Sequence, residues 1–152
     1  MDLRAAVSSA DFALARELFR EYVQTPDVAV CVVGFEEELA RLETFYELVL
    51  LAFDSETPVG CGAMRPLPDG TAEMKRLYVR PSARGLKAGR ALTEGLIEAA
   101  RARGYPALRL DTLPSMMAAQ SLYKSLGFVE IPTYSAGNPP TATCYELRLE
   151  GR

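Results

Sequence analysis

A short basic turn, Arg84-Gly85-Leu86-Lys87-Ala88-Gly89, follows an apolar run that ends at Val79. Pro81 ends the strand that this run predicts, and helical periodicity begins at about Gly89. The first N–H groups of a helix have no intrahelical partners, and the helix dipole makes that end positive. A strand, a glycine-containing turn and a helix start in this order therefore predict a phosphate site. Three cations support this prediction: Arg84, Lys87 and Arg90.

The residue types that are missing limit the chemistry further. The chain has no histidine, which excludes Ser-His and Cys-His nucleophiles and histidine-ligated metal sites. A general base must therefore be a carboxylate, a tyrosine, a cysteine, a lysine or water. Cys31, Cys61 and Cys144 are odd in number and form no CxxC motif. We interpret each as a small buried residue in a reduced cytosolic protein, and we expect no metal.

Length and composition indicate a single domain over residues 1–152. The chain is 49% hydrophobic and 24% charged, which is typical of a globular protein. Its net charge of -3 argues against nucleic-acid binding, so a small anion explains the basic turn better than a long polyanion. No signal-peptide pattern opens the chain, and no apolar stretch approaches the ~18 residues of a membrane span. We expect a cytoplasmic protein with no membrane association.

The order of hydrophobic patterns predicts a mixed α/β fold. Three apolar runs joined by short turns predict an antiparallel meander, although Gly60 and Gly62 weaken the second of them. Ser8 or Ser9 is expected to cap the first helix. We expect strands over residues 3–6, 48–53, 59–65, 71–79, 108–112, 128–131 and 143–149, helices over residues 10–23, 35–47, 89–103 and 114–126, and a loop over residues 25–34.

Two motifs, taken together, resemble the GNAT superfamily of acyl-CoA-dependent N-acyltransferases. The strand that ends at Val79 and the turn over residues 84–89 are similar to the family's fourth strand and pyrophosphate loop, commonly Gln/Arg-x-x-Gly-x-Gly/Ala. The second motif is Ala119-x-x-Leu122-Tyr123-x-x-x-Gly127-Phe128. The resemblance covers nearly the whole chain and implies a central mixed, mostly antiparallel sheet of six to seven strands flanked by four helices. Two positions depart from the family pattern: Lys87 replaces the middle glycine, and Met116 replaces a frequent asparagine.

The resemblance implies an N-acetyltransferase that moves an acetyl (acyl) group from the cosubstrate acetyl-CoA to an amine, by direct attack in a ternary complex. The pantetheine arm would add to the open edge of the strand over residues 71–79, where a backbone N–H would polarise the thioester carbonyl. N–H groups of the turn would hold the pyrophosphate. The implied cofactor-binding residues are Leu77, Tyr78, Val79, Arg84, Gly85, Leu86, Lys87, Ala88, Gly89 and Arg90.

Glu73 is the first candidate for the general base that takes a proton from the ammonium form of the acceptor. Strand alternation predicts that it shares a face with Lys75, Leu77 and Val79. Its alternative role is an exposed glutamate paired with Lys75 or Arg76, and Asp111 is a second candidate base. Tyr123 is the general-acid candidate, because the resemblance implies a hydroxyl near the CoA sulfur; its alternative role is a half-buried core residue.

The acceptor amine remains open at this stage, as does a homodimer. The loop over residues 131–143, with Tyr134 and Asn138, is expected to shape the acceptor site. The glutamates of the helix over residues 35–47 fit a cationic amine, although Glu37 and Glu38 are more simply a solvated helix face. Two other functions are compatible with the sequence. One is a catalytically inactive CoA-binding regulatory or sensor module, and the other is a partner-binding domain whose cofactor site Lys87 blocks.

Overall fold

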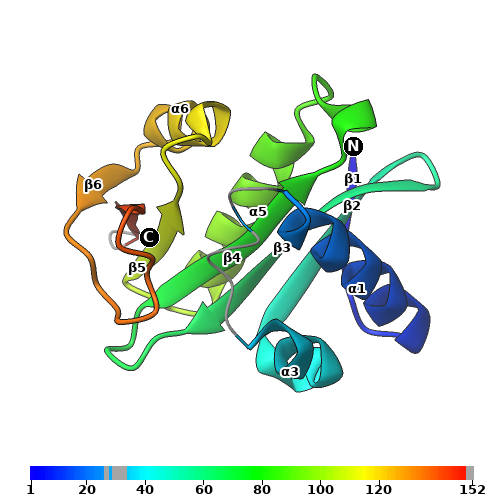
Figure 1. Cartoon of the computed structure of the whole chain (residues 1–152), viewed down its shortest axis with the longest axis horizontal. Helices are drawn as coiled ribbons and strands as arrows, with labels where there is room; N and C mark the ends of the chain where they lie inside the picture. The colour runs from blue at the N-terminus through cyan, green and yellow to red at the C-terminus, as the bar shows by residue number, and fades with distance from the viewer. Residues whose placement is uncertain (26–27, 29–33, 150–152) are drawn as a thin grey trace.

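The computed structural model describes residues 1–25, 28 and 34–149. Its strands form one seven-stranded sheet in the order β1-β2-β3-β4-β5-β7-β6 (Figure 1). Every neighbouring pair is antiparallel except β4 and β5, which run parallel. The strands are β1 Asp2–Ala5, β2 Leu48–Asp54, β3 Thr57–Pro66, β4 Ala72–Val79, β5 Ala107–Thr112, β6 Val129–Ile131 and β7 Thr143–Arg148. The mixed, mostly antiparallel sheet and its meander are therefore confirmed.

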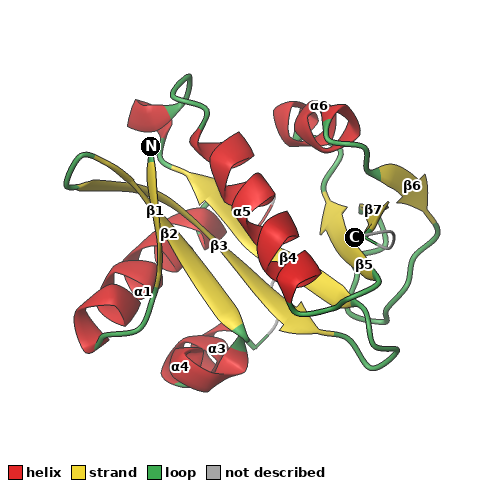
Figure 2. Cartoon of the chain, turned by 180° about the vertical axis from the view of Figure 1, so that it is seen from behind, coloured by secondary structure: helices red, strands yellow, loops and turns green. Residues whose placement is uncertain are grey.

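Helices cover both faces of the sheet. Helices α1, α3 and α4 lie on one face, and α5 crosses the opposite face, as the two opposed views show (Figures 1 and 2). The bounds are α1 Ser9–Val23, α3 Phe35–Ala40, α4 Leu42–Phe45, α5 Ala88–Ala102 and α6 Met117–Ser125, with a 3-10 turn at Pro81–Ala83. None of the described helices has the length and hydrophobicity that a bilayer crossing requires.

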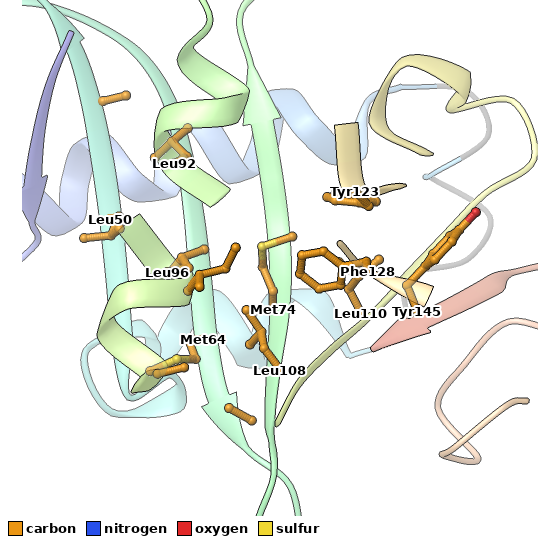
Figure 3. Close-up of a cluster of buried hydrophobic side chains, with 14 of the residues drawn as sticks. Leu50, Met64, Met74, Leu92, Leu96, Leu108, Leu110, Tyr123, Phe128 and Tyr145 are labelled. Carbon is orange, nitrogen blue, oxygen red and sulfur yellow. The ribbon is translucent and has the colours of Figure 1, made fainter. Parts of the chain in front are cut away.

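Each face has its own apolar core. On the α5 side, leucines and methionines of the sheet pack against Leu92 and Leu96 of α5, and the cluster extends to Tyr123, Phe128 and Tyr145 (Figure 3). On the other side, Phe19 of α1 and Leu42 of α4 pack against residues of β2 and β3. The two cores hold the strands rigidly from both sides, so the edge between β4 and β5 is set by packing rather than by loops.

The ends of the helices show how the local sequence acts. Ser8 caps α1 through its side chain, which accepts from the Asp11 N–H at 3.1 Å, while the Asp11 carboxylate accepts from the Ser8 N–H at 3.2 Å. The single helix expected over residues 35–47 is instead two short helices, because Arg41 between them leaves the helical region at φ -116 and ψ 26. The loop expected over residues 25–34 lies mostly outside the described residues, as does Cys31.

Candidate active site

The parallel strands β4 and β5 separate soon after they meet. They pair only at Ala72 with Leu108 and at Glu73 with Arg109. β4 continues to Val79 and β5 to Thr112, and a pocket occupies the space between the diverging halves. The splay that the family resemblance implies is therefore present. It leaves backbone N–H and C=O groups of β4 at an open edge, where an extended ligand can add as a strand.

A β-bulge turns β4 at the start of this open edge. Cys61 and Ala63 of β3 pair with Tyr78 and Lys75, so β4 contributes one extra residue between the two pairs. Arg76 lies in the left-handed region with a φ of 62°. That conformation costs a non-glycine residue about 1–2 kcal/mol, so contacts elsewhere must hold it.

A buried ion pair with α3 holds the bulge in place. The Arg76 guanidinium donates to both carboxylate oxygens of Glu38, at 2.7 and 2.9 Å, and the Tyr46 hydroxyl donates to the same carboxylate at 2.8 Å. Glu38 is only 3% exposed, so its interpretation as a solvated residue is wrong. Glu37 does keep an exposed side chain. A carboxylate on a helix 38 positions away thus fixes the strained residue of the catalytic strand.

The bulge also changes which side chains share a face. Leu77 and Val79 pack toward the α5 core, whereas the Glu73 carboxylate accepts from Arg65, whose guanidinium lies over the Phe45 ring of α4. The expectation that Glu73 shares a face with Leu77 and Val79 is therefore wrong. Simple alternation fails here because the inserted residue reverses the sides of the strand.

Glu73 is a buried residue with two partners. Its exposure is 1%, Arg65 Nε donates to one carboxylate oxygen at 2.9 Å, and the Tyr134 hydroxyl donates to the other. Burial, and next the Glu73 charge, raises the pKa of Tyr134 above its ordinary value. Glu73 does not belong to the described residues that line the two pockets of the site. The alternative of an exposed, simply paired glutamate is also wrong, because this carboxylate is enclosed.

An outer groove of about 520 Å³ lies between the end of β4, the basic turn and the start of α6. The Ala91 N–H makes the first helical bond of α5, to the Lys87 carbonyl at 3.0 Å, so the N–H groups of Ala88, Gly89 and Arg90 have no intrahelical partner and can face a ligand. Of the ten predicted cofactor-binding residues, Leu86 and Arg90 do not line the groove. The other eight do: Leu77, Tyr78, Val79, Arg84, Gly85, Lys87, Ala88 and Gly89.

The three cations of the basic turn differ in whether a carboxylate of the protein already neutralises them. Arg90 lies 3.3 Å from the Glu94 carboxylate, one turn along α5. Within the described part of the chain, Arg84 and Lys87 have no carboxylate partner, and both side chains are exposed. Two uncompensated cations and a helix N-terminus therefore meet at one end of the groove, which favours an anion there.

Lys87 occupies the family's glycine position with a glycine-like backbone. Its φ of 61° and ψ of 27° lie in the left-handed region, and Gly85 nearby has a φ of 97°. The loop therefore keeps its turn despite the substitution, at a conformational cost of about 1–2 kcal/mol. Lys87 therefore differs from a glycine in its side chain, while its backbone stays in the region that glycine adopts without cost.

An inner pocket of about 100 Å³ continues from the outer groove into the gap between β4 and β5. Tyr22, Leu77, Met116 and Ala119 line both, so the two spaces adjoin. Tyr123 lines the inner pocket from α6, is 4% exposed, and packs against Phe128 with ring centroids 5.6 Å apart. Burial raises the pKa of Tyr123 above its ordinary value of 10.0, so its hydroxyl keeps its proton at neutral pH.

Thr112, which also lines the inner pocket, has a buried and unpaired hydroxyl. Its side chain is 5% exposed, and its Oγ1 atom has no hydrogen-bond partner within the described structure. An unpaired buried hydroxyl costs about 1–3 kcal/mol, so such groups usually have a role outside the folded chain itself. Sequence reasoning did not identify Thr112, because a threonine at a strand end carries no distinguishing pattern.

Three polar residues from separate segments meet beside the inner pocket. Lys75 Nζ of β4 lies 3.6 Å from Asp111 Oδ1 of β5, and Asn138 Nδ2 donates to the other Asp111 oxygen at 2.8 Å. Lys75 and Asp111 line the pocket, together with Gly137 and Pro139 of the loop that precedes β7. The expected contribution of this loop to the site is visible in these contacts. Tyr22 of α1, which the sequence did not single out, also borders both spaces.

A strand edge that opens over a helix N-terminus, with a tyrosine at the inner end, defines the architecture of an acyl-CoA-dependent acyltransferase. The family model described as acetyltransferase (GNAT) family matches residues 12–128. An uncharacterized N-acetyltransferase of Schizosaccharomyces pombe is 38% identical over 139 residues, which cover 88% of this chain and 84% of the relative. The IAA acetyltransferase of Azospirillum brasilense is 42% identical over 82 residues, 53% of this chain and 54% of that protein.

A solved structure agrees at the level of the fold. The Salmonella typhimurium protein yncA, solved with its cofactor acetyl-CoA, has a TM-score of 0.74 at 23% identity, covering 100% of this chain and 95% of that chain. The chain belongs to the GNAT acetyltransferase family and is an acyltransferase of that family.

Proposed function

We propose that this protein binds acetyl-CoA along the outer groove and transfers its acetyl group to an amine held in the inner pocket. The observation that carries the proposal is the contiguity of three features. An open strand edge, a helix N-terminus with two cations that lack a carboxylate partner among the described residues, and a buried tyrosine border two adjoining spaces. The acetyl-CoA complex of yncA, which has the same fold, supports this choice of cosubstrate.

The cofactor contacts follow the shape of the groove. The pyrophosphate lies against the N–H groups that precede Ala91 in α5 and against the Arg84 and Lys87 side chains. The pantetheine arm extends along the backbone of Leu77, Tyr78 and Val79, as a strand added to the open edge of β4. Leu86 within the turn and Arg90 directly after it do not line the groove; they contribute through backbone geometry and charge.

The reaction is a direct transfer. The amine nitrogen bonds to the acetyl carbonyl carbon, a backbone N–H at the bulge polarises the carbonyl oxygen, and the carbon–sulfur bond breaks. The ammonium form of the acceptor loses one proton to a base, and then to solvent, before attack. Tyr123 gives its proton to the departing thiolate, and the second proton that the nitrogen loses after attack restores the Tyr123 hydroxyl. One proton is released in total.

Asp111 is better placed than Glu73 to accept the first proton. Asp111 borders the inner pocket, whereas both oxygens of Glu73 already accept from Arg65 and Tyr134. Glu73, the base expected from the sequence, would act only through a relay and otherwise holds Tyr134 in place. A general base must first lie within reach of the proton that it accepts. We therefore choose Asp111, and substitution of Asp111 and Glu73 tests the choice.

Thiol release from acetyl-CoA tests the function directly. Purified protein is incubated with acetyl-CoA and a panel of amines, and free thiol is measured together with the mass of the acetylated product. We expect acceptor-dependent thiol release with a matching product. Binding of acetyl-CoA with no turnover of any amine would instead indicate a CoA-binding sensor module, and the enzymatic proposal would be wrong.

A further inference from the structure

The charges around the inner pocket discriminate between acceptor classes. Among the described residues, three charged side chains border it: Lys75, Arg76 and Asp111. Glu38 neutralises Arg76 through two hydrogen bonds of 2.7 and 2.9 Å. Lys75 and Asp111, referred to below as the Lys75–Asp111 couple, therefore supply the charges that an acceptor meets.

The Lys75–Asp111 couple is loosely bonded for a pair so well enclosed. The two side chains are 16% and 13% exposed, yet their charged atoms lie 3.6 Å apart. A strong charge-assisted hydrogen bond is about 2.7–2.9 Å long. Arg65 and Glu73 on the neighbouring strands reach 2.9 Å. An ammonium has three donors, so a lysine held at this distance from its partner keeps hydrogen-bonding capacity for a ligand.

Like-charge repulsion argues against a simple cationic amine. A primary ammonium bound at Asp111 would lie beside the Lys75 ammonium, and the pocket would then hold an extra positive charge away from water. The glutamates that favoured a cationic acceptor in the sequence do not compensate. Glu38 is already neutralised by Arg76, and the Glu37 side chain is 74% exposed.

We propose that the acceptor is a free α-amino acid, a deduction that rests on the proposed function above. Its ammonium would lie at Asp111 and its carboxylate at Lys75. One carbon separates the two groups of an α-amino acid, which suits opposite charges whose atoms lie 3.6 Å apart. The zwitterion replaces one loose ion pair by two and adds no net charge to the pocket. The amine bound at Asp111 is then the nucleophile, and Asp111 takes its proton.

The rest of the pocket limits the side chain of that amino acid. Gly137, Pro139 and Ala142 form the wall contributed by the loop, and Leu113 and Met116 lie among the other lining residues. These groups are small or apolar, and the volume is about 100 Å³. A compact apolar side chain fits this wall. A lysine within a protein and a peptide N-terminus are both poor acceptors, because neither has a free carboxylate next to its amine.

Matched acceptors test this proposal. Thiol release is compared for L-alanine and L-methionine, for their carboxamides, and for ethylamine, with wild-type protein and acetyl-CoA. Loss of a charge-assisted hydrogen bond to the carboxylate is expected to lower kcat/KM about 10- to 100-fold for the amides. Lys75→Met should bring the ratio of kcat/KM for the free amino acid to kcat/KM for its carboxamide close to one. Lys75→Arg should keep the preference, as should Arg103→Met, which removes a cation paired with Glu47 outside both pockets.

The possible outcomes separate the two proposals. If acetyl-CoA binds and the amides or ethylamine react as well as the free amino acids, the α-amino acid assignment is wrong while the acetyltransferase function stands. The assignment is equally wrong if acetyl-CoA binds and no free amino acid in a panel of twenty releases thiol. If calorimetry detects no acetyl-CoA binding, the proposed function itself fails.

Discussion

Arg76 and Glu38 form a two-point ion pair, at 2.7 and 2.9 Å, that joins the bulge of β4 to helix α3. The pair holds Arg76 in the left-handed conformation directly before the backbone that would polarise the thioester. Glu38→Gln should therefore lower kcat about 10-fold, equivalent to ~1.4 kcal/mol in the barrier, while the Kd for acetyl-CoA changes less than about threefold. Steady-state kinetics and calorimetry measure the two effects.

Stability provides the check on this interpretation. Removing the charge that compensates a buried arginine should lower the free energy of unfolding by up to about 3–5 kcal/mol. Glu37→Gln, on the adjacent exposed position of the same helix, is the matched control and should change neither activity nor stability. Equal weakening of kcat and acetyl-CoA affinity by Glu38→Gln would mean that the pair maintains the whole site, and not the bulge alone.

The two carboxylates near the pocket can be distinguished by substitution. Asp111 borders the inner pocket, and Glu73 lies behind it with Arg65 and Tyr134. Asp111→Asn should reduce kcat by about 10²–10⁴-fold, the usual range for a general base. Glu73→Gln should reduce it less, because its effect passes through the loop residue Tyr134. The reverse order of the two variants would restore Glu73 as the base.

Tyr123 should act as the acid over the whole accessible pH range. Burial raises the pKa of its hydroxyl above 10.0, so the proton stays on the oxygen as the pH rises from neutral toward 10. The rate should rise with pH as the acceptor amine deprotonates, with no falling limb below pH 10 that belongs to Tyr123. Tyr123→Phe should lower kcat and leave acetyl-CoA affinity largely intact. A descending limb near neutral pH that Tyr123→Phe abolishes would contradict this role.

Substitution of Thr112 should affect ligand binding and stability in opposite directions. Its hydroxyl is buried without a partner beside the inner pocket, so Thr112→Val removes an unsatisfied group and leaves the shape unchanged. The variant should unfold at the same temperature as wild type or a higher one, with a gain of up to ~1 kcal/mol. Its affinity for acetyl-CoA should fall about 3- to 10-fold if the hydroxyl bonds the bound thioester arm. Unchanged affinity together with lower stability would contradict a ligand contact.

The strands and the basic turn before α5 could be predicted because local patterns specify them. The meander follows from apolar runs and short turns, and Lys87 and Gly85 lie at the expected start of α5. The bulge could not be predicted from period-two alternation, since an arginine with positive φ has no sequence signature. One available signal was Gly60, where an added Cβ would lie 2.7 Å from the Tyr78 carbonyl oxygen. A glycine within a strand marks such close backbone approaches.

The polar contacts of the site depend on distant residues. Glu38 and Arg76 are far apart in the chain, and Glu38 had no local feature to distinguish it from Glu37. The same holds for Asp111 and Asn138, which come together only when the loop before β7 folds over β5. Pairing of this kind arises from the tertiary fold, so single-sequence patterns identify the candidate residues but not their partners.

The basic turn supports a prediction that separates charge from backbone strain. Lys87 has the φ of 61° that glycine adopts at no cost. Lys87→Gly should therefore preserve stability or raise it by about 1 kcal/mol, measured by thermal unfolding, while it weakens acetyl-CoA binding through the lost cation. Tighter binding by Lys87→Gly would show instead that the lysine obstructs the pyrophosphate.

The most direct measurement is calorimetric titration of acetyl-CoA into wild-type protein and into the Arg84→Ala/Lys87→Ala double variant. Arg84 and Lys87 lie on the groove wall without carboxylate partners among the described residues. We expect a wild-type Kd on the order of micromolar and at least ~10-fold weaker binding by the double variant. No wild-type binding at millimolar acetyl-CoA, or equal affinity of the two proteins, would contradict the assignment of this groove to the cofactor.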